Sequence, residues 1–113
     1  MKDKHIIDLE KYRSIQGQRK SRVFTGRDRG KYVRTKSDFD KIFQNSKKVL
    51  LRIPEDIFSI TPSFLEELFL NMAKKYSKEE ILEKIDLSGN KYDLFEALSE
   101  AIDRIKQDVN GLE

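Results

Sequence analysis

The feature that most constrains this fold is a short apolar run that leads directly into a long amphipathic segment, within residues 49–76. Residues 49–53 are almost continuously apolar and stop at Pro54, a pattern typical of a strand buried in a sheet. From residue 61 to residue 76, large apolar side chains recur at helical spacing, while the charged residues fall mostly on the other side. A strand followed by helices and then by another strand requires a crossover connection, so the sequence predicts a sheet that is at least partly parallel.

The rest of the chain continues this alternation of strands and helices. Short apolar runs predict further strands, and helical spacing with capping residues predicts further helices. We therefore expect strands at residues 5–9, 21–25 and 85–88, a helix over residues 31–45 that Ser37 divides, a helix over residues 78–84 capped by Ser77, and a helix from Tyr92 to about Val109. Gly26 and Gly30 bound a polar stretch that predicts a turn.

These elements define the predicted fold class. It is α/β, at the border with α+β: a small mixed β-sheet of about four strands with helices packed on one face. The length of 113 residues suits a single domain that spans residues 1–113. We expect the two ends of the chain, residues 1–4 and 110–113, to be frayed.

Composition excludes several kinds of active site. The chain has no cysteine and a single histidine, His5, near the N-terminus, so it lacks thiolate ligands, cysteine nucleophiles and clusters of imidazoles. Glu66 and Glu67 are adjacent, and adjacent residues on a helix point about 100° apart, so they cannot act as a catalytic carboxylate pair. We expect no metal, no tightly bound cofactor and no enzymatic activity.

Hydropathy indicates where the protein is found. No stretch approaches the roughly 18 apolar residues of a membrane span. Residues 1–5 are not followed by the apolar core of a signal peptide. We therefore expect no membrane contact and a cytoplasmic location.

The formal net charge of +3 hides two halves of opposite sign. Residues 1–52 hold 16 basic and 6 acidic residues, a net charge of +10, whereas residues 53–113 hold 7 and 14, a net charge of −7. The densest basic stretch begins at Lys11 and ends at Lys36, with Asp28 as its one acidic residue. Such asymmetry indicates an anionic partner, a nucleic acid or a phosphate ligand. The alternative is that the basic half faces the acidic half within the domain or in a second copy.

Three arginines of this stretch are candidate anion-binding residues: Arg27, Arg29 and Arg34. Guanidinium groups match phosphate or carboxylate groups, and Gly26 or Gly30 can expose backbone N–H groups to an anion. In the alternative, the glycines only form a turn, and Arg34 pairs with an internal carboxylate such as Glu66 or Glu67. The sequence leaves both interpretations of the arginines open.

Two alternative capping patterns lie at the start of the helix after the central strand. Thr61 can cap the helix with Pro62 in its first turn, or Ser63 can cap it with Glu66 at the spacing of a capping box. The connection before it, residues 55–60, contains three large apolar residues. This loop either packs over the edge of the sheet or exposes an apolar patch to a partner.

Two short motifs carry a resemblance to a known family. Residues 26–34 follow the pattern Gly-Arg-x-x-Gly-x-x-x-Arg, and residues 60–68 follow Ile-Thr-x-Ser-Phe-x-x-Glu-Leu, with the apolar strand 49–53 between them. In this order and spacing, residues 20–108 resemble the STAS superfamily, the domains found in sulfate transporters and anti-sigma factor antagonists. The closer resemblance is to the bacterial STAS-like domain of unknown function.

The resemblance implies a mixed sheet with helices on one side and a role for a serine. In anti-sigma factor antagonists, a serine at this helix start is phosphorylated by a partner kinase, and its phosphorylation controls binding to that partner. Ser63 falls at the corresponding place, although Phe64 follows it where the family pattern has glycine. A phosphoserine there would carry about −1.5 to −2 charges at the positive end of a helix dipole. The alternative role of Ser63 is helix capping.

The sequence therefore predicts a non-enzymatic regulatory or protein-interaction module of STAS-like type, with a signalling role and Ser63 as a phosphorylation switch. Its partner is expected to be a protein, such as a kinase-like regulator, and its oligomeric state is left open. The expected partner-binding residues surround the helix start: Phe58, Ser59, Thr61, Ser63 and Phe64. The alternative is binding of a nucleic acid or a phosphate ligand through the stretch from Lys11 to Lys36.

Overall fold

Strands and helices alternate along the chain. The computed structural model describes residues 2–91 and 93–111. The elements in chain order are β1 (Lys2–Asp8), the 3-10 helix η1 (Leu9–Tyr12), β2 (Ile15–Gln16), β3 (Arg19–Lys20), β4 (Val23–Phe24), α1 (Arg27–Ser37), α2 (Phe39–Asn45), β5 (Ser46–Arg52), β6 (Ser59–Ile60), α3 (Pro62–Leu68), α4 (Leu70–Lys75), α5 (Lys78–Lys84), β7 (Ile85–Asp86) and α6 (Phe95–Gly111). The strands β1, β5 and β7 form the central sheet, with β5 in the middle.

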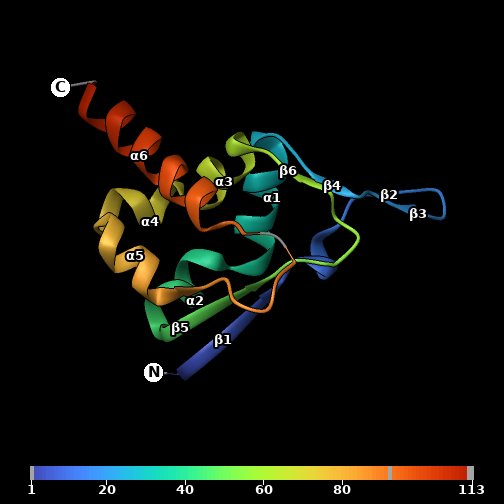
Figure 1. Cartoon of the computed structure of the whole chain (residues 1–113), viewed down its shortest axis with the longest axis horizontal. Coiled ribbons are helices and arrows are strands. Elements are labelled where there is room, and N and C mark those ends of the chain that lie inside the picture. The colour runs from blue at the N-terminus through green and yellow to red at the C-terminus, as the bar shows by residue number, and fades with distance from the viewer. Residues whose placement is uncertain (1, 92, 112–113) are drawn as a thin grey trace.

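Helices cover one face of the central sheet, and the other face is open. Successive side chains of a strand point to opposite faces, and in β5 the buried Val49 and Leu51 alternate with the exposed Lys48 and Arg52. Figure 1 shows α1, α3, α4 and α6 on the same side of β1 and β5. The predicted fold class, α/β with helices packed on one face of a small sheet, is confirmed.

The sheet differs from the prediction in detail. It has three strands rather than about four, and both of its strand pairs are parallel. The strand predicted at residues 21–25 contracts to β4, which pairs with β6 through Val23–Ser59 and Phe24–Ile60 and stands apart from the central sheet. This short ladder brings the segment before α1 beside the segment before α3, so the two helices begin close together.

Helix α1 begins earlier than predicted, because the stretch from Gly26 to Gly30 is not a turn. Gly26 is the N-cap residue, with φ 84° and ψ 160°, a backbone conformation that favours glycine. The helix then runs from Arg27, and Gly30 lies buried inside it. A glycine in a helix interior costs about 1 kcal/mol relative to alanine, and here the missing side chain allows α3 to approach.

Two predicted helices are each divided. Asp38, with φ 59°, separates α1 from α2, one residue after the division predicted at Ser37. The segment predicted as one helix up to Tyr76 is divided at Phe69 (φ −95°, ψ 6°) into α3 and α4. Phe69 is fully buried, and its ring lies edge-on to that of Phe39 with 5.0 Å between the centroids. The break therefore coincides with a contact in the core.

Helix α5 and strand β7 agree with the prediction, whereas α6 begins later than predicted, because Asp93 and Leu94 are not helical. The Ser77 side chain accepts a hydrogen bond from Glu80 N, and the Glu80 side chain accepts one from Ser77 N, which forms a capping box at the start of α5. Strand β7 follows directly. The predicted helix start at Tyr92 lies outside the described residues, as do Met1 and residues 112–113 of the ends predicted to be frayed.

The core lies between the helices and the covered face of the sheet. Its largest fully buried side chains include five phenylalanines: Phe24, Phe39, Phe43, Phe64 and Phe69. In the described ranges, no helix combines the length and the apolar character needed to cross a membrane.

Candidate functional site

The two sequence motifs meet in space, because α1 packs against α3. Between the two helices, Gly30 faces the backbone of Phe64 and the side chain of Glu67 so closely that a Cβ on residue 30 would clash with both. The glycine therefore serves a close contact between helices rather than the predicted turn.

Arginines on either side of Gly30 pair with the carboxylate of Glu67. Arg34 donates hydrogen bonds to the Glu67 carbonyl oxygen and, at 3.3 Å, to Glu67 Oε1. Arg27, two helical turns earlier, lies 3.7 Å from Glu67 Oε2. The side chain of Arg34 is 13% exposed and that of Glu67 is 15% exposed. Of the two alternatives for Arg34, the structure places it in the internal ion pair.

Glu66 joins a third helix to this contact. Its side chain is 8% exposed and lies 3.4 Å from Arg27 on α1 and 3.7 Å from Arg104 on α6. A buried carboxylate needs such partners, because water no longer solvates it. The two glutamates thus link α1, α3 and α6, and they engage both Arg27 and Arg34.

Arg29, the third candidate anion ligand, contacts two tyrosines. Its guanidinium carbon lies 4.6 Å from the ring centroid of Tyr32, within the range of a cation–π contact. It also donates a long hydrogen bond of 3.5 Å to the carbonyl oxygen of Tyr12. Each of the three arginines therefore makes a contact within the domain.

The charge asymmetry of the sequence is partly used inside the domain. Ion pairs that join the basic half to the acidic half include Lys4–Asp86, Arg13–Asp56, Arg27–Glu66 and Arg34–Glu67. Another part of the basic stretch lies in the hairpin formed by β2 and β3, which projects from the body at the right of Figure 1. Arg19 and Ile15 of this hairpin are exposed.

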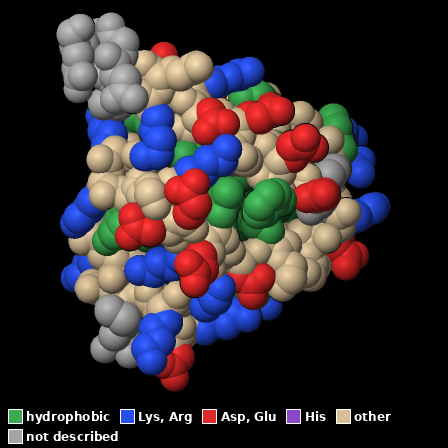
Figure 2. Space-filling view, turned by 60° about the vertical axis from the view of Figure 1, so that its left-hand side comes forward, with side chains coloured by type: hydrophobic (Ala, Val, Ile, Leu, Met, Phe, Trp, Pro, Cys, Tyr) green, Lys and Arg blue, Asp and Glu red, His purple; other side chains and the backbone are tan. Residues whose placement is uncertain are grey.

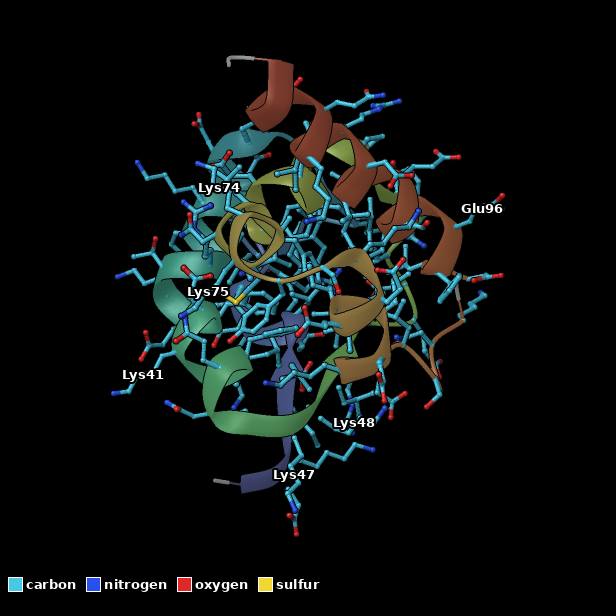
Figure 3. All side chains as sticks on the ribbon, turned by 90° about the vertical axis from the view of Figure 1, so that its left-hand side faces the viewer. Lys41, Lys47, Lys48, Lys74, Lys75 and Glu96 are labelled. Atoms are coloured by element: carbon cyan, nitrogen blue, oxygen red, sulfur yellow. The ribbon has the colours of Figure 1, made fainter. Side chains whose placement is uncertain are left out.

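Figure 2 shows several acidic side chains around a small apolar patch, with basic side chains on the same face. Phe95, the first residue of α6, is 55% exposed. In Figure 3, Lys74 and Lys75 lie on the opposite side from Glu96.

Thr61 caps α3, which decides between the two predicted caps. Its side-chain oxygen accepts a hydrogen bond from Phe64 N at 3.4 Å and another from Gly26 N at 3.1 Å. Pro62 is the first residue of the helix. Ser63 does not cap the helix; its hydroxyl oxygen lies 3.2 Å from that of Thr61 and is half-buried.

The five predicted partner-binding residues divide into three groups by exposure. Phe64 is fully buried and packs on Phe24 with 5.3 Å between the ring centroids, so it cannot contact a partner, contrary to the prediction. Its position on the apolar stripe of α3 explains this burial. Phe58, by contrast, is 63% exposed. The remaining three are half-buried: Ser59, Thr61 and Ser63.

A recess lies beside Phe58. Its volume is about 250 Å³, and its lining comes from two segments, the one that includes β6 and the one just before α6: Phe58, Ser59, Ile60, Asp93 and Leu94. We call it the Phe58 recess. The guanidinium carbon of Arg22 lies 5.8 Å from the centroid of the Phe58 ring. The loop of residues 55–60 thus matches both predicted alternatives, since Ile57 is fully buried while its neighbour Phe58 is exposed.

Arg13 holds the Phe58 loop against the body. Its guanidinium donates to both carboxylate oxygens of Asp56, at 2.9 and 2.7 Å, and to the carbonyl oxygen of Ser21. The Arg13 side chain is 4% exposed. Its hydrogen bonds and charge lower the pKa of Asp56, as expected for a bidentate ion pair. The sequence did not single out this pair, because its members are 43 residues apart.

The structure has a second recess, of about 350 Å³, that the sequence did not predict. It lies between the junction of α2 with β5 and helix α5, and Lys47 and Lys48, labelled in Figure 3, contribute to its lining. The Lys84 ammonium nitrogen lies 4.9 Å from the ring centroid of Phe43 and 5.9 Å from that of Tyr76. Burial lowers the pKa of Lys84. The lysines that line this recess come from separate points of the chain, so no single stretch of the sequence predicted it.

Within residues 2–91 and 93–111, no group of three or more His, Asp or Glu side chains is arranged to hold a metal ion. Comparisons with protein-family models, with curated proteins and with solved structures found no match. The resemblance to STAS-like domains therefore stays a prediction, and function has to be inferred from the surface itself.

Proposed function

We propose that this chain is a non-enzymatic protein-interaction module that binds a partner protein through the Phe58 recess. The observation that carries the proposal is the 63% exposure of Phe58 beside a recess that both apolar and polar residues line. Aromatic residues that lie next to a pocket are typical of the few residues that dominate the energy of a protein–protein interface.

The Phe58 loop is held in place before a partner binds. Phe58 N donates to the Arg22 carbonyl oxygen at 2.9 Å, Ile57 is fully buried beside it, and Arg13 binds Asp56. A preordered loop loses little conformational entropy when it binds, so more of the contact energy contributes to affinity.

The lining of the Phe58 recess indicates the chemistry of the partner. Ile60 and Leu94 supply an apolar surface, and Asp93 adds a carboxylate. Arg22 is exposed beside the Phe58 ring. We expect the partner to insert an apolar side chain into the recess and to place polar groups of both charges around it, which is the usual arrangement of a small interface.

Ser63 is the proposed point of regulation in a cytoplasmic signalling role. It lies three residues after Ile60, a lining residue of the Phe58 recess, and its hydroxyl contacts that of Thr61. A phosphate on Ser63 would replace this contact and add about −1.5 to −2 charges at the edge of the proposed interface. A kinase-like regulator could thereby control partner binding.

The test is site-specific photo-cross-linking in extract from the source organism. A photoreactive phenylalanine analogue at position 58 is compared with the same analogue at position 15, because Ile15 is 64% exposed on the β2–β3 hairpin and does not line the recess. We expect one discrete adduct from position 58, suppressed by excess wild-type protein and not by excess Phe58→Ala. The same adducts from both positions, or none from position 58, would contradict the proposal.

Regulation through Ser63 has its own test. Mass spectrometry of the protein isolated from its host under several growth conditions should detect phosphate on Ser63. The position-58 adduct should weaken or disappear with Ser63→Glu and persist with Ser63→Ala. An unmodified Ser63 under every condition, together with an adduct that is unchanged in Ser63→Glu, would leave the interaction proposal without its switch.

The second candidate function is binding of a nucleic acid or another phosphate-bearing ligand. It is supported by the projecting β2–β3 hairpin, which carries the exposed Arg19, and by the exposed Lys31 and Lys36 of α1. Titration with DNA and RNA over a salt series tests it, because each phosphate contact adds to the slope of affinity against salt. A steep slope that Arg19→Ala reduces would favour this function, and undetectable binding at low salt would contradict it.

A further inference from the structure

Strand β1 is an edge strand with a free outer side. It pairs with β5, and no other strand in the described part of the chain lies beside it. It runs for seven residues without a glycine or a proline. Figure 1 shows it at the lower border of the molecule. Exposed strand edges of this kind pair readily with a further strand.

The side chains on the open face of β1 form a self-complementary series. Because alternate residues of a strand share a face, Lys4, Ile6 and Asp8 lie together on the face opposite to the buried Ile7. Ile6 is 45% exposed. The order along the strand is cation, apolar residue, anion. When two such strands run antiparallel, each cation therefore faces an anion and the two apolar residues face each other.

We propose that β1 pairs with β1 of a second copy of this chain, antiparallel and centred on Ile6, so that two central sheets join into one sheet of six strands. In this register, Ile6 faces Ile6 of the second copy, and each Lys4 faces Asp8 of the other copy. Pairs of opposite charge and pairs of branched apolar residues stabilise antiparallel strands. No residue of β1 lines the Phe58 recess, so the dimer leaves that surface free for a partner.

Both charged residues have partners within one chain, and in the dimer Lys4 exchanges its partner. Lys4 Nζ lies 3.2 Å from Asp86 Oδ2 with its side chain 52% exposed, and Asp8 Oδ1 accepts a hydrogen bond from Glu10 N at 3.1 Å. Asp86 lies on β7, on the far side of β5 from the free edge, so Lys4 has to exchange Asp86 for Asp8 of the other copy. Asp8 can keep its bond to Glu10 N, because a carboxylate has two oxygens. Two strand edges bury less area than a standard interface of about 1,600 Å². The dimer is therefore expected to be weak and dependent on concentration.

The first test uses the full chain, which has no cysteine of its own. Ile6→Cys places a thiol on the two-fold axis of the proposed dimer. Opposite residues of antiparallel strands have Cα atoms about 4.5–5.5 Å apart, within the reach of a disulfide. Ile15→Cys is the matched control, because Ile15 is 64% exposed. Under mild oxidation at equal protein concentration, we expect Ile6→Cys to form a covalent dimer about tenfold faster than Ile15→Cys. Equal rates would overturn the proposal.

The second test addresses the register through charge reversal. In the Ile6→Cys background, Lys4→Glu sets a carboxylate against Asp8 of the other copy and should slow disulfide formation about tenfold. Adding Asp8→Lys restores opposite charges across the axis and should restore the rate. Lys47→Glu is the control, since Lys47 is a 67% exposed lysine of β5 that pairs with Asp3, and it should leave the rate unchanged. No recovery in the double variant, or an equal effect of Lys47→Glu, would overturn the register.

Asp8→Lys also removes the cap of η1, so it could change the rate by changing the stability of the protein. The salt dependence of the rate provides a second readout that needs no substitution at Asp8. Salt screens charge pairs at a surface. The Ile6→Cys rate should therefore fall as salt rises, whereas the rate of Ile6→Cys with Lys4→Glu should rise. The same salt dependence in both proteins would contradict a Lys4–Asp8 pairing.

Discussion

Gly30 of α1 and Glu67 of α3 lie so close that no methyl group fits between them. A Cβ on residue 30 would lie 2.8 Å from the Glu67 Cβ and 2.6 Å from the Phe64 carbonyl oxygen. The Glu67 carboxylate lies between Arg27 and Arg34, one on either side of Gly30 along α1. Gly30 thus leaves room for the Glu67 side chain, and the two arginines of α1 pair with its carboxylate.

Replacing Gly30 with alanine should destabilise the protein by about 1–3 kcal/mol, because the added methyl group overpacks the contact. Alanine itself favours a helix over glycine by about 1 kcal/mol, so a loss of stability would mean that the clash outweighs propensity. Urea unfolding measures the change. Thr35→Ala, at an exposed position of the same helix, should change stability by less than about 0.5 kcal/mol. A Gly30→Ala protein as stable as wild type would mean that the helices can move apart without cost.

Replacing Arg34 with methionine should cost about 1–3 kcal/mol, because it removes the donor to the Glu67 carbonyl and one partner of its carboxylate. Part of this loss should be absent when Glu67 is already methionine, and a double-mutant cycle measures that coupling. Lys36→Met, at an exposed site of α1, should be nearly neutral. Additive losses for Arg34→Met and Glu67→Met would show that the two side chains do not stabilise each other.

The sequence was sufficient to predict those helices and strands whose buried residues recur at a regular spacing. The strand at β5 and the apolar stripe of α3 and α4 are specified by neighbours in the chain, because a single face decides which residues are buried. The start of α1 was not predictable in this way. A glycine pair in a polar stretch is equally typical of a turn and of a close helix contact, and Gly30 is distinguished only by Glu67, which lies far along the chain.

The candidate site shows the same limit. Phe58 and Phe64 are the same residue type within one short segment, and the helical spacing placed Phe64 on the apolar stripe. The exposure of Phe58 depends on the ladder between β4 and β6 and on the bond of Arg13 to Asp56. No local pattern contains these long-range contacts, so the sequence could place Phe64 in the core but could not show that Phe58 faces solvent.

Thr61 and Ser63 should respond differently to replacement by alanine, because only Thr61 caps α3. Thr61→Ala removes the acceptor for Phe64 N and for Gly26 N, and it should cost about 1–2 kcal/mol. Ser63→Ala removes only the contact between the two hydroxyls and should cost less than about 0.5 kcal/mol. Thermal unfolding of the two variants side by side measures the difference. Equal losses would assign part of the capping role to Ser63.

Asp86 should make the protein sensitive to acid over a defined range. Hydrogen bonds from the Ser88 hydroxyl and Ser88 N, with the Lys4 ammonium, lower the pKa of Asp86 from 3.8 to about 2. Because the pKa is lower in the folded state, the stabilisation is fully present above pH 3.8 and is lost as the pH falls towards about 2. Unfolding temperatures measured across this range should therefore fall less steeply for Asp86→Asn than for wild type.

The Asp86 contacts can be separated by a second variant and a direct titration. Ser88→Ala removes the hydroxyl donor, which is the largest cause of the lowered pKa, so the carboxyl group should titrate nearer to its usual range. Carboxyl carbon NMR shifts followed against pH report the pKa of Asp86 itself, apart from other acidic residues. An Asp86 that titrates at its ordinary pKa in wild type, or a pKa that Ser88→Ala leaves unchanged, would mean that the turn after β7 does not stabilise the ionised carboxylate. The acid sensitivity of the protein would then have to arise from other carboxylates, such as Asp56 beside Arg13, whose pKa is also lowered.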